Sequence, residues 1–280
     1  MDIQQNSCPV CQATEAKYLF PAGNGELMQC QTCKLTYFTP RPTPEELSQF
    51  YNSASYREEF QNSIMAGEDF AKARYKQLKD IIKRYAPSVL TDSHRHFLDI
   101  GCGTGDLLSV AASDGWDITG TEISPLVVQN VTTNLKNKIL VGDIFSLDLP
   151  QNYYDVITIY HVIEHLLSPV DTLVKMKELL SPNGIVFIET PNIGGLGAKL
   201  KGKNWSQIFP PEHITYFNPS SLKYALKQSN FSDFVVFTAS PILVESVSAM
   251  PWLFQGMGKS IYNIAPLLNL GAALQSVASK

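Results

Sequence analysis

The sequence lacks any cluster of basic residues and any long run of like charge. Lys and Arg total 22 among 280 residues, against 26 Asp and Glu, and the formal net charge is −4. Tight non-specific binding to a phosphate backbone depends on clustered Lys and Arg, so no nucleic-acid partner is expected. Met1 to Ser7 contain neither a basic stretch nor an apolar core, so we expect no secretory signal and a cytoplasmic location.

The most informative segment is Phe97 to Asp106, which reads FLDIGCGTGD. An apolar run ends at Asp99, and a helix-compatible stretch, Asp106 to Ala112, follows the loop. The glycines alternate with other residues at Gly101, Gly103 and Gly105. Glycine allows a positive φ and the close approach of a ligand, and the N-terminus of a helix offers free N–H groups. This order of strand, tight loop and helix predicts a site for a nucleotide-like ligand.

The acids around the loop distinguish two ligand classes. Dinucleotide sites usually carry a third glycine in G-x-G-x-x-G, whereas here that position is Asp106, whose carboxylate would repel a diphosphate. Asp99 adds a second anion, which suits an ammonium group. Glu122 ends a second predicted strand, Asp117 to Thr121, and a carboxylate there can accept both hydroxyls of a ribose. S-adenosylmethionine combines an ammonium group, a ribose diol and an adenine without a phosphate.

With these motifs the chain resembles the class I S-adenosylmethionine-dependent methyltransferases, over residues 97–192. Val141 to Ile144 is similar to the family's third motif, Tyr154 to His165 to its fourth strand and following turn, and Leu179 to Ile188 to its fifth strand. The resemblance implies an α/β fold with a Rossmann-like, seven-stranded, mostly parallel sheet whose last strand is antiparallel. It also implies an enzyme that transfers a methyl group from this cofactor.

The cofactor site is expected from the motifs and the resemblance together. The residues predicted to contact S-adenosylmethionine are Asp99, Gly101, Cys102, Gly103, Gly105, Glu122, Ile123, Asp143, Ile144 and His161. The resemblance implies that Asp143 pairs with the adenine amino group. Cys102 is interpreted as a small side chain packed under the ligand rather than as a nucleophile.

Four of the five cysteines form a second motif. Cys8 and Cys11 make one C-x2-C pair, and Cys30 and Cys33 make another eighteen residues later. This spacing is within the range of four-thiolate zinc sites. A redox dithiol would need only one pair, and disulfides are the competing interpretation, disfavoured in a reducing compartment. Four thiolates leave zinc no open position, so we predict a structural Zn2+ that folds residues 1–40 as a zinc ribbon.

The remaining segments are expected to form the acceptor side. Residues 41–90 are predicted to be a linker and lid helices, and residues 91–240 the cofactor-binding core. After the fifth strand, the glycine-rich loop 193–198 and the aromatic and proline-rich segment 205–217 are expected to line a substrate wall. His213 and His161 are the candidate catalytic bases, since imidazole titrates near neutral pH. The predicted acceptor is a small molecule such as a natural product, a sugar or an isoprenoid-type intermediate, with O, N and C all open as the methylated atom.

Residues 241–280 are apolar but interrupted. Between Ser246 and Lys280 the only charged side chains are Lys259 and Lys280. Every apolar run stops short of the roughly twenty residues that span a bilayer; the interrupting residues are Pro251, Gly256, Gly258, Pro266 and Asn269. We expect an apolar helical insertion followed by the last strand at residues 271–278. Through residues 246–278 the insertion would cover the acceptor pocket, form a homodimer contact or rest peripherally on a membrane.

Two alternative classes stay open. One is a nucleic-acid or protein methyltransferase that uses the zinc ribbon for recognition, although the N-P-P-Y/F-type motif of base methylation is missing after the fourth strand. The other is a non-catalytic nucleotide-binding module.

Overall fold

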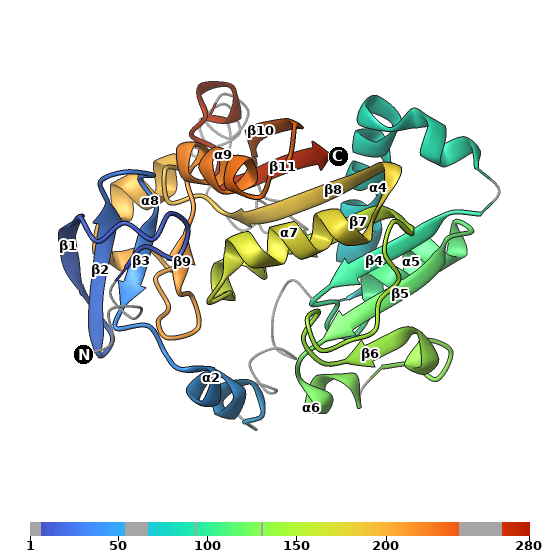
Figure 1. Cartoon of the computed structure of the whole chain (residues 1–280), viewed down its shortest axis with the longest axis horizontal. Coiled ribbons are helices and arrows are strands. Elements are labelled where there is room, and N and C mark those ends of the chain that lie inside the picture. The colour runs from blue at the N-terminus through green and yellow to red at the C-terminus, as the bar shows by residue number, and fades with distance from the viewer. Residues whose placement is uncertain (1–6, 54–66, 93, 130, 241–264) are drawn as a thin grey trace, which may run out of the picture.

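A seven-stranded sheet forms the centre of the molecule, with the strand order β10-β11-β8-β7-β4-β5-β6 (Figure 1). The computed structural model describes residues 7–53, 67–92, 94–129, 131–240 and 265–280. The strands of this sheet are β4 (His96–Ile100), β5 (Asp117–Glu122), β6 (Ile139–Val141), β7 (Tyr154–Tyr160), β8 (Leu180–Pro191), β10 (Asp233–Ala239) and β11 (Ala273–Ser279). Strand β11 is antiparallel to both of its neighbours, β8 and β10, and the pairs among β6, β5, β4, β7 and β8 are parallel. The predicted Rossmann-like sheet with an antiparallel last strand is confirmed.

Helices cover both faces of this sheet, because alternate side chains of its strands point in opposite directions. Phe97 and Val156 pack in one buried cluster with residues of α4 (Glu68–Tyr85) and α5 (Asp106–Ser113). Leu98 and Ile157 pack in the other with residues of α7 (Pro169–Leu179) and α9 (Pro219–Gln228). Apolar residues therefore line these strands almost continuously, as expected for a sheet buried on both sides.

A second, four-stranded sheet lies at one end of the molecule, with the order β1-β2-β3-β9 (Figure 1). Its first three strands, β1 (Ala16–Ala22), β2 (Gly25–Cys30) and β3 (Thr36–Thr39), come from the predicted ribbon. Its fourth strand, β9 (Thr215–Tyr216), comes from the segment that was expected to form the acceptor wall. Hydrogen bonds between backbones therefore join the ribbon to that segment.

Shorter helices complete the chain. They are α2 (Pro44–Tyr51), α6 (Pro125–Val128), α8 (Leu196–Lys201) and the 3-10 helices η1 (Pro87–Thr91), η2 (Lys136–Lys138), η3 (Ile163–His165), η4 (Gly202–Asn204) and η6 (Ala265–Leu268). Helix α2 begins with a capping box, since Thr43 Oγ1 accepts a hydrogen bond from the Glu46 N–H at 3.2 Å and Glu46 Oε2 accepts one from the Thr43 N–H at 2.8 Å. The segment expected as the fifth strand forms β8, which starts directly after α7.

The described part of the apolar C-terminal region begins at residue 265. Strand β11 confirms the last strand expected at residues 271–278, shifted by one or two residues at its ends. The predicted helical insertion, and with it most of the 246–278 contact surface, falls on residues 241–264, outside the described residues. Within the described residues, we find no helix with the length and apolarity required to cross a bilayer. The predicted domain division at residues 40, 90 and 240 stays a prediction.

Candidate active site

The glycine loop connects β4 to α5 in the conformation that its composition predicts. Gly101, Gly103 and Gly105 have φ values of +68°, +56° and +80°, a region that residues with a Cβ rarely adopt. A Cβ on Gly101 would also lie 2.4 Å from the Val162 Cγ2 atom. Gly105 occupies the N-cap position of α5, so the loop directs the N-terminus of that helix toward the carboxyl edge of the sheet.

Two buried carboxylates flank the loop. Glu122 accepts hydrogen bonds from the Gly103 N–H at 3.1 Å and the Ser124 N–H at 2.9 Å, and burial raises its pKa although these bonds oppose the shift. Asp99 accepts a hydrogen bond from Thr158 Oγ1 at 2.6 Å. Burial raises the pKa of Asp99 to about 7, against the opposing effect of that hydrogen bond. Both oxygens of Glu122 keep further lone pairs for a ligand.

A cavity of about 880 Å³ opens beside this loop, within the usual size range of small-molecule sites. Nine of the ten predicted cofactor residues line it: Asp99, Gly101, Cys102, Gly103, Glu122, Ile123, Asp143, Ile144 and His161. Gly105 does not line the cavity, and it acts through its backbone conformation instead. Asp143 also accepts a hydrogen bond from the Phe145 N–H at 2.8 Å, which shapes the turn after β6.

Sequence reasoning missed Arg74, whose guanidinium lies in the same cavity. Its Cζ atom is 4.1 Å from the centre of the Tyr160 ring and 4.6 Å from that of Phe70, and its Nη2 atom is 3.7 Å from Glu189 Oε1. The Nε and Nη2 atoms are buried without a hydrogen-bond partner among the described residues. Arg74 stands in an ordinary amphipathic helix, α4, so no local motif distinguishes it.

His161 lies at the end of β7 with a φ of +53°, an unusual value for a residue with a side chain. Its Nδ1 atom is 3.3 Å from Glu164 Oε1 and its Nε2 atom is 3.4 Å from Glu189 Oε1. Burial alone would lower its pKa, but the two carboxylates raise that pKa to about 9. His161 is therefore an imidazolium at neutral pH, which argues against the general-base role expected from its position.

Three titratable side chains that line the cavity lie close together: Glu164, His165 and His213. The rings of His165 and His213 have their centroids 4.7 Å apart, at an angle of 78°. Burial and the neighbouring His165 lower the pKa of His213 to about 4, so its ring is neutral at pH 7. The expected position of His213, facing the same cavity as the glycine loop, agrees with this geometry, and its catalytic role stays a prediction.

The glycine-rich loop 193–198 has a different role from the one expected. Gly194 and Trp205 line a separate cavity of about 260 Å³ against Leu19 and Phe20 of β1. A Cβ on Gly195 would lie 2.7 Å from the Gly271 oxygen, so this glycine is required by backbone packing near the start of β11. Of the predicted substrate wall, the residues that line the large cavity are Ser206, Gln207, Phe209, Glu212 and His213.

A family model described as a methyltransferase domain matches residues 70–234, more than half of the chain. The chain belongs to this methyltransferase family. The matched residues contain the glycine loop, Glu122, Arg74 and His213, so the family match and the cavity coincide. The expected family is confirmed.

Relatives and solved structures agree with this membership. The methyltransferase is 27% identical over 151 residues to a ubiquinone biosynthesis O-methyltransferase of Photobacterium profundum, a match that covers 50% of this chain and 64% of that protein. It is 30% identical over 106 residues to the mitochondrial enzyme of that name from Schizosaccharomyces pombe, covering 35% of this chain and 38% of that protein. The match therefore spans less than two thirds of the length of either relative.

Two solved structures share the fold of the methyltransferase. A SAM-dependent methyltransferase from Archaeoglobus fulgidus has a TM-score of 0.55 and 22% identity, covering 80% of this chain and 100% of that one. Phosphoethanolamine N-methyltransferase 2 of Haemonchus contortus, in complex with phosphomonomethylethanolamine and S-adenosylhomocysteine, has a TM-score of 0.59 and 19% identity, covering 85% of this chain and 61% of that one. At these identities the likeness shows the fold alone.

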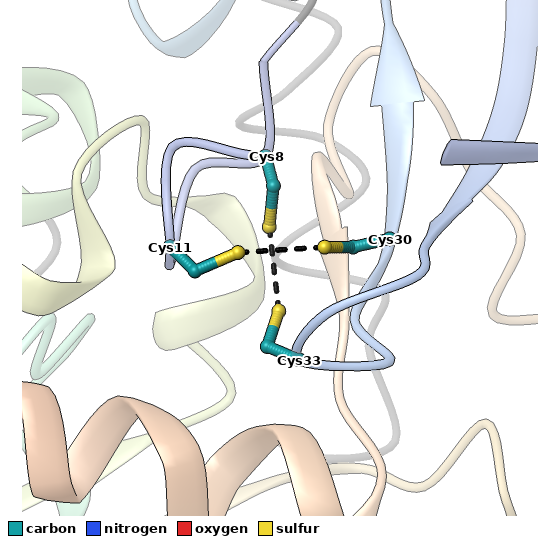
Figure 2. A group of neighbouring side chains, drawn as sticks. All are labelled: Cys8, Cys11, Cys30 and Cys33. Atoms are coloured by element: carbon teal, nitrogen blue, oxygen red, sulfur yellow. Dashed lines mark hydrogen bonds between the residues drawn. The ribbon is translucent and has the colours of Figure 1, made fainter. Parts of the chain in front are cut away.

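The four N-terminal cysteines of the methyltransferase converge on one point from two loops (Figure 2). The Cys8 and Cys33 sulfurs are 3.4 Å apart, as are those of Cys11 and Cys30, and the four sulfurs lie within 4.8 Å of one another. A disulfide would require about 2.05 Å, whereas thiolates bound tetrahedrally at about 2.3 Å from zinc lie a little under about 4 Å apart. The cluster therefore fits the predicted four-thiolate zinc site.

Proposed function

We propose that this methyltransferase transfers a methyl group from S-adenosylmethionine to a small-molecule acceptor. The observation that carries the proposal is that one cavity is lined both by the glycine loop and Glu122 and by His165 and His213. A transferase needs its donor and acceptor in one enclosure, with the reacting atoms in contact and water excluded. The proposed structural Zn2+ of the four cysteines lies outside this cavity.

The lining of the cavity suits each part of the cofactor. Glu122 offers two buried carboxylate oxygens for the ribose hydroxyls. Ile123 and Phe145 line the cavity with 45% and 55% of their surface exposed, which leaves apolar area for the adenine. The Asp99 carboxylate forms an ion pair with the ammonium group of the methionine part. Arg74 carries buried N–H donors without hydrogen-bond partners among the described residues, and we assign it to the methionine carboxylate.

The transfer itself needs little from the protein beyond position. The acceptor forms a bond to the methyl carbon while the S–CH3 bond breaks and its electron pair stays on sulfur, giving S-adenosylhomocysteine. His213 donates its Nδ1–H to the Gln207 carbonyl oxygen at 2.8 Å, which leaves its Nε2 lone pair unused by this bond. His161 acts in this scheme as a cation that holds Glu164 and Glu189 in place.

The acceptor end of the cavity favours a neutral hydroxyl compound. Leu47, Leu167 and Phe209 give it apolar walls, and Glu164 and Glu212 give it negative charge. Among the described lining residues, the only Lys or Arg side chain is Arg74, and the His161 imidazolium is already paired with Glu164 and Glu189. The two relatives are named as ubiquinone biosynthesis O-methyltransferases, which also supports oxygen as the methylated atom.

Incubation with methyl-labelled S-adenosylmethionine and a metabolite extract tests this function. Mass spectrometry should find a labelled product of low molecular mass whose formation is lost in Glu122→Gln. An equal test with labelled cofactor and bulk protein or nucleic acid should give no incorporation. Label in those polymers would favour a nucleic-acid or protein methyltransferase that uses the zinc ribbon for recognition. Tight cofactor binding without transfer to any acceptor would favour a non-catalytic binding module.

A further inference from the structure

One carboxylate oxygen and two imidazole nitrogens meet at the acceptor end of the cavity. The ligand atoms of Glu164, His165 and His213 lie within 4.8 Å of one another, and all three residues line the cavity. Glu164 and His165 belong to η3, directly after β7, whereas His213 precedes β9. Two hydrogen bonds bring these segments together: the Ile214 N–H donates to the Glu164 carbonyl oxygen at 2.9 Å, and Thr215 Oγ1 donates to the Ile163 carbonyl oxygen at 3.2 Å.

Each histidine is oriented by a backbone carbonyl. The Nδ1 atom of His165 is 3.0 Å from the Glu212 oxygen, and that of His213 is 2.8 Å from the Gln207 oxygen. A carbonyl only accepts, so in each ring Nδ1 carries the proton of this bond, and Nε2 is the nitrogen left to bind a metal ion. Imidazoles fixed in this way by their second nitrogen are typical of metal ligands.

Glu164 supplies a buried negative charge to the same point. Its Oε2 atom accepts a hydrogen bond from Thr190 Oγ1 at 2.9 Å. Its Oε1 atom is buried without a partner in hydrogen-bond geometry among the described residues. The nearby His161 imidazolium lies between Glu164 and Glu189, and Glu189 is also 3.7 Å from Arg74 Nη2. The His161 imidazolium lies 3.3 Å from this oxygen, outside hydrogen-bond geometry, so Oε1 keeps a lone pair for a metal ion.

We propose that Glu164, His165 and His213 bind a divalent transition-metal ion, separate from the zinc site of the four cysteines. Two imidazole nitrogens and one carboxylate oxygen suit zinc, manganese or iron, whereas Mg2+ and Ca2+ prefer oxygen ligands alone. Ligand atoms bound at about 2.0–2.2 Å lie roughly 3–4 Å apart, so small side-chain rotations bring the observed atoms into place. Three protein ligands leave further positions of the ion open toward the cavity.

The chemical consequence rests on the proposed function and concerns the acceptor class. An acceptor hydroxyl bound to the ion would have its pKa lowered, as a metal-bound water does, and its proton would pass to solvent water. The resulting oxygen anion forms the O–CH3 bond as the S–CH3 bond breaks toward sulfur. The site therefore favours phenols, enols and alcohols, and His213 serves as a ligand rather than as a free base.

Manganese binding tests the site without any acceptor. Protein is first treated with EDTA, and elemental analysis confirms that the cysteine zinc is retained. Mn2+ is then titrated, and the loss of the free-ion signal is followed by electron paramagnetic resonance. The wild type should bind one Mn2+ per chain with a dissociation constant in the micromolar range. His165→Ala and His213→Ala should each weaken this binding at least tenfold, and His94→Ala, which removes an exposed histidine before β4, should not.

Calorimetric measurements serve as controls for the folding of the variants used in the metal-binding test. Calorimetry should show that the two histidine variants still bind S-adenosylhomocysteine, which proves that they are folded. A Glu164→Gln variant is less suited to this test, because loss of a buried carboxylate can unfold the protein. Absence of Mn2+ binding and of a second zinc equivalent in the wild type would overturn the metal site. Equal Mn2+ affinity in wild type and both variants would do the same. Failure of S-adenosylhomocysteine binding in the wild type would instead count against the proposed function, independently of the metal result.

Discussion

Arg74 lies with its guanidinium carbon 4.1 Å from the centre of the Tyr160 ring, so α4 places a buried cation beside the carboxyl end of β7. Cation–π contact stabilises that charge without consuming its N–H donors. Glu189 approaches Nη2 to 3.7 Å but does not satisfy it. The arginine is thus held in position with donors left for a ligand.

Replacement of this arginine should weaken binding of the methionine part of the cofactor without affecting binding of its adenosine part. Arg74→Met should weaken binding of S-adenosylhomocysteine about 10- to 100-fold, because a charge-assisted pair with its carboxylate is lost. Binding of 5′-methylthioadenosine, which has no carboxylate, should hardly change. Calorimetry with both ligands measures this difference, and Arg84→Met, on the exposed side of the same helix, is the matched control. An equal loss for both ligands would place Arg74 in a structural role.

Glu122→Gln should test the ribose assignment with little change of shape. The amide is neutral and offers one acceptor oxygen in place of two, so cofactor affinity should fall by roughly 2–3 kcal/mol. Calorimetry with S-adenosylmethionine measures the loss, and the exposed Glu26→Gln on β2 serves as the control. Unchanged affinity would show that the ribose binds elsewhere.

Asp99 should make cofactor binding depend on pH. Burial raises its pKa to about 7 in the ligand-free protein, while the ammonium group of the ligand favours the ionised carboxylate. The affinity should therefore rise with pH and level off above about 7, with a loss of about tenfold per unit below it. Calorimetry between pH 5.5 and 8.5 gives the profile, and the proton release is counted in buffers of different ionisation enthalpy. Asp99→Asn should bind more weakly and without this slope.

Loss of the proposed zinc ion should affect both the ribbon and the segment around His213. Freshly purified, reduced protein should contain one tightly held zinc per chain, and Cys30→Ser should lose it and unfold the ribbon. The cofactor domain should stay folded, so S-adenosylhomocysteine should still bind. Turnover should fall nevertheless, because β3 of the ribbon pairs with β9, two residues after His213. Elemental analysis, calorimetry and a transfer assay distinguish these effects, and a protein without zinc would contradict the site.

Local patterns in the sequence predicted the features that depend on neighbouring residues. The glycine loop, Glu122 and the two C-x2-C pairs each carry their chemistry within a short stretch, and β11 was expected from the family resemblance. Arg74 could not be predicted, because its role depends on contact with Tyr160, far along the chain. The meeting of Glu164 with His213 likewise depends on a backbone hydrogen bond between Ile214 and Glu164, which are far apart along the chain. Spacing within the sequence does not reveal such contacts.

Both glycine-rich segments were expected to face a ligand, and the structure shows that their glycines have different roles. At Gly101 a positive φ and a close neighbour agree with a ligand loop, as predicted. At Gly195 the same residue type allows close packing against the backbone of Gly271. The strained φ of His161 was not foreseen either, since nothing in the residues around it distinguishes a twisted strand end from a regular one.

Strand β11 lies inside the sheet, between β8 and β10, although both of these strands precede it along the chain. During synthesis, residues up to 240 leave the ribosome before the strand that joins β8 to β10 exists. Until residues 273–279 emerge, both neighbours present open edges, which are exposed to pairing with other chains. A nascent chain, or one truncated before residue 273, is therefore at the greatest risk of aggregation at this stage, and the arrival of β11 acts as the closing step in forming the sheet.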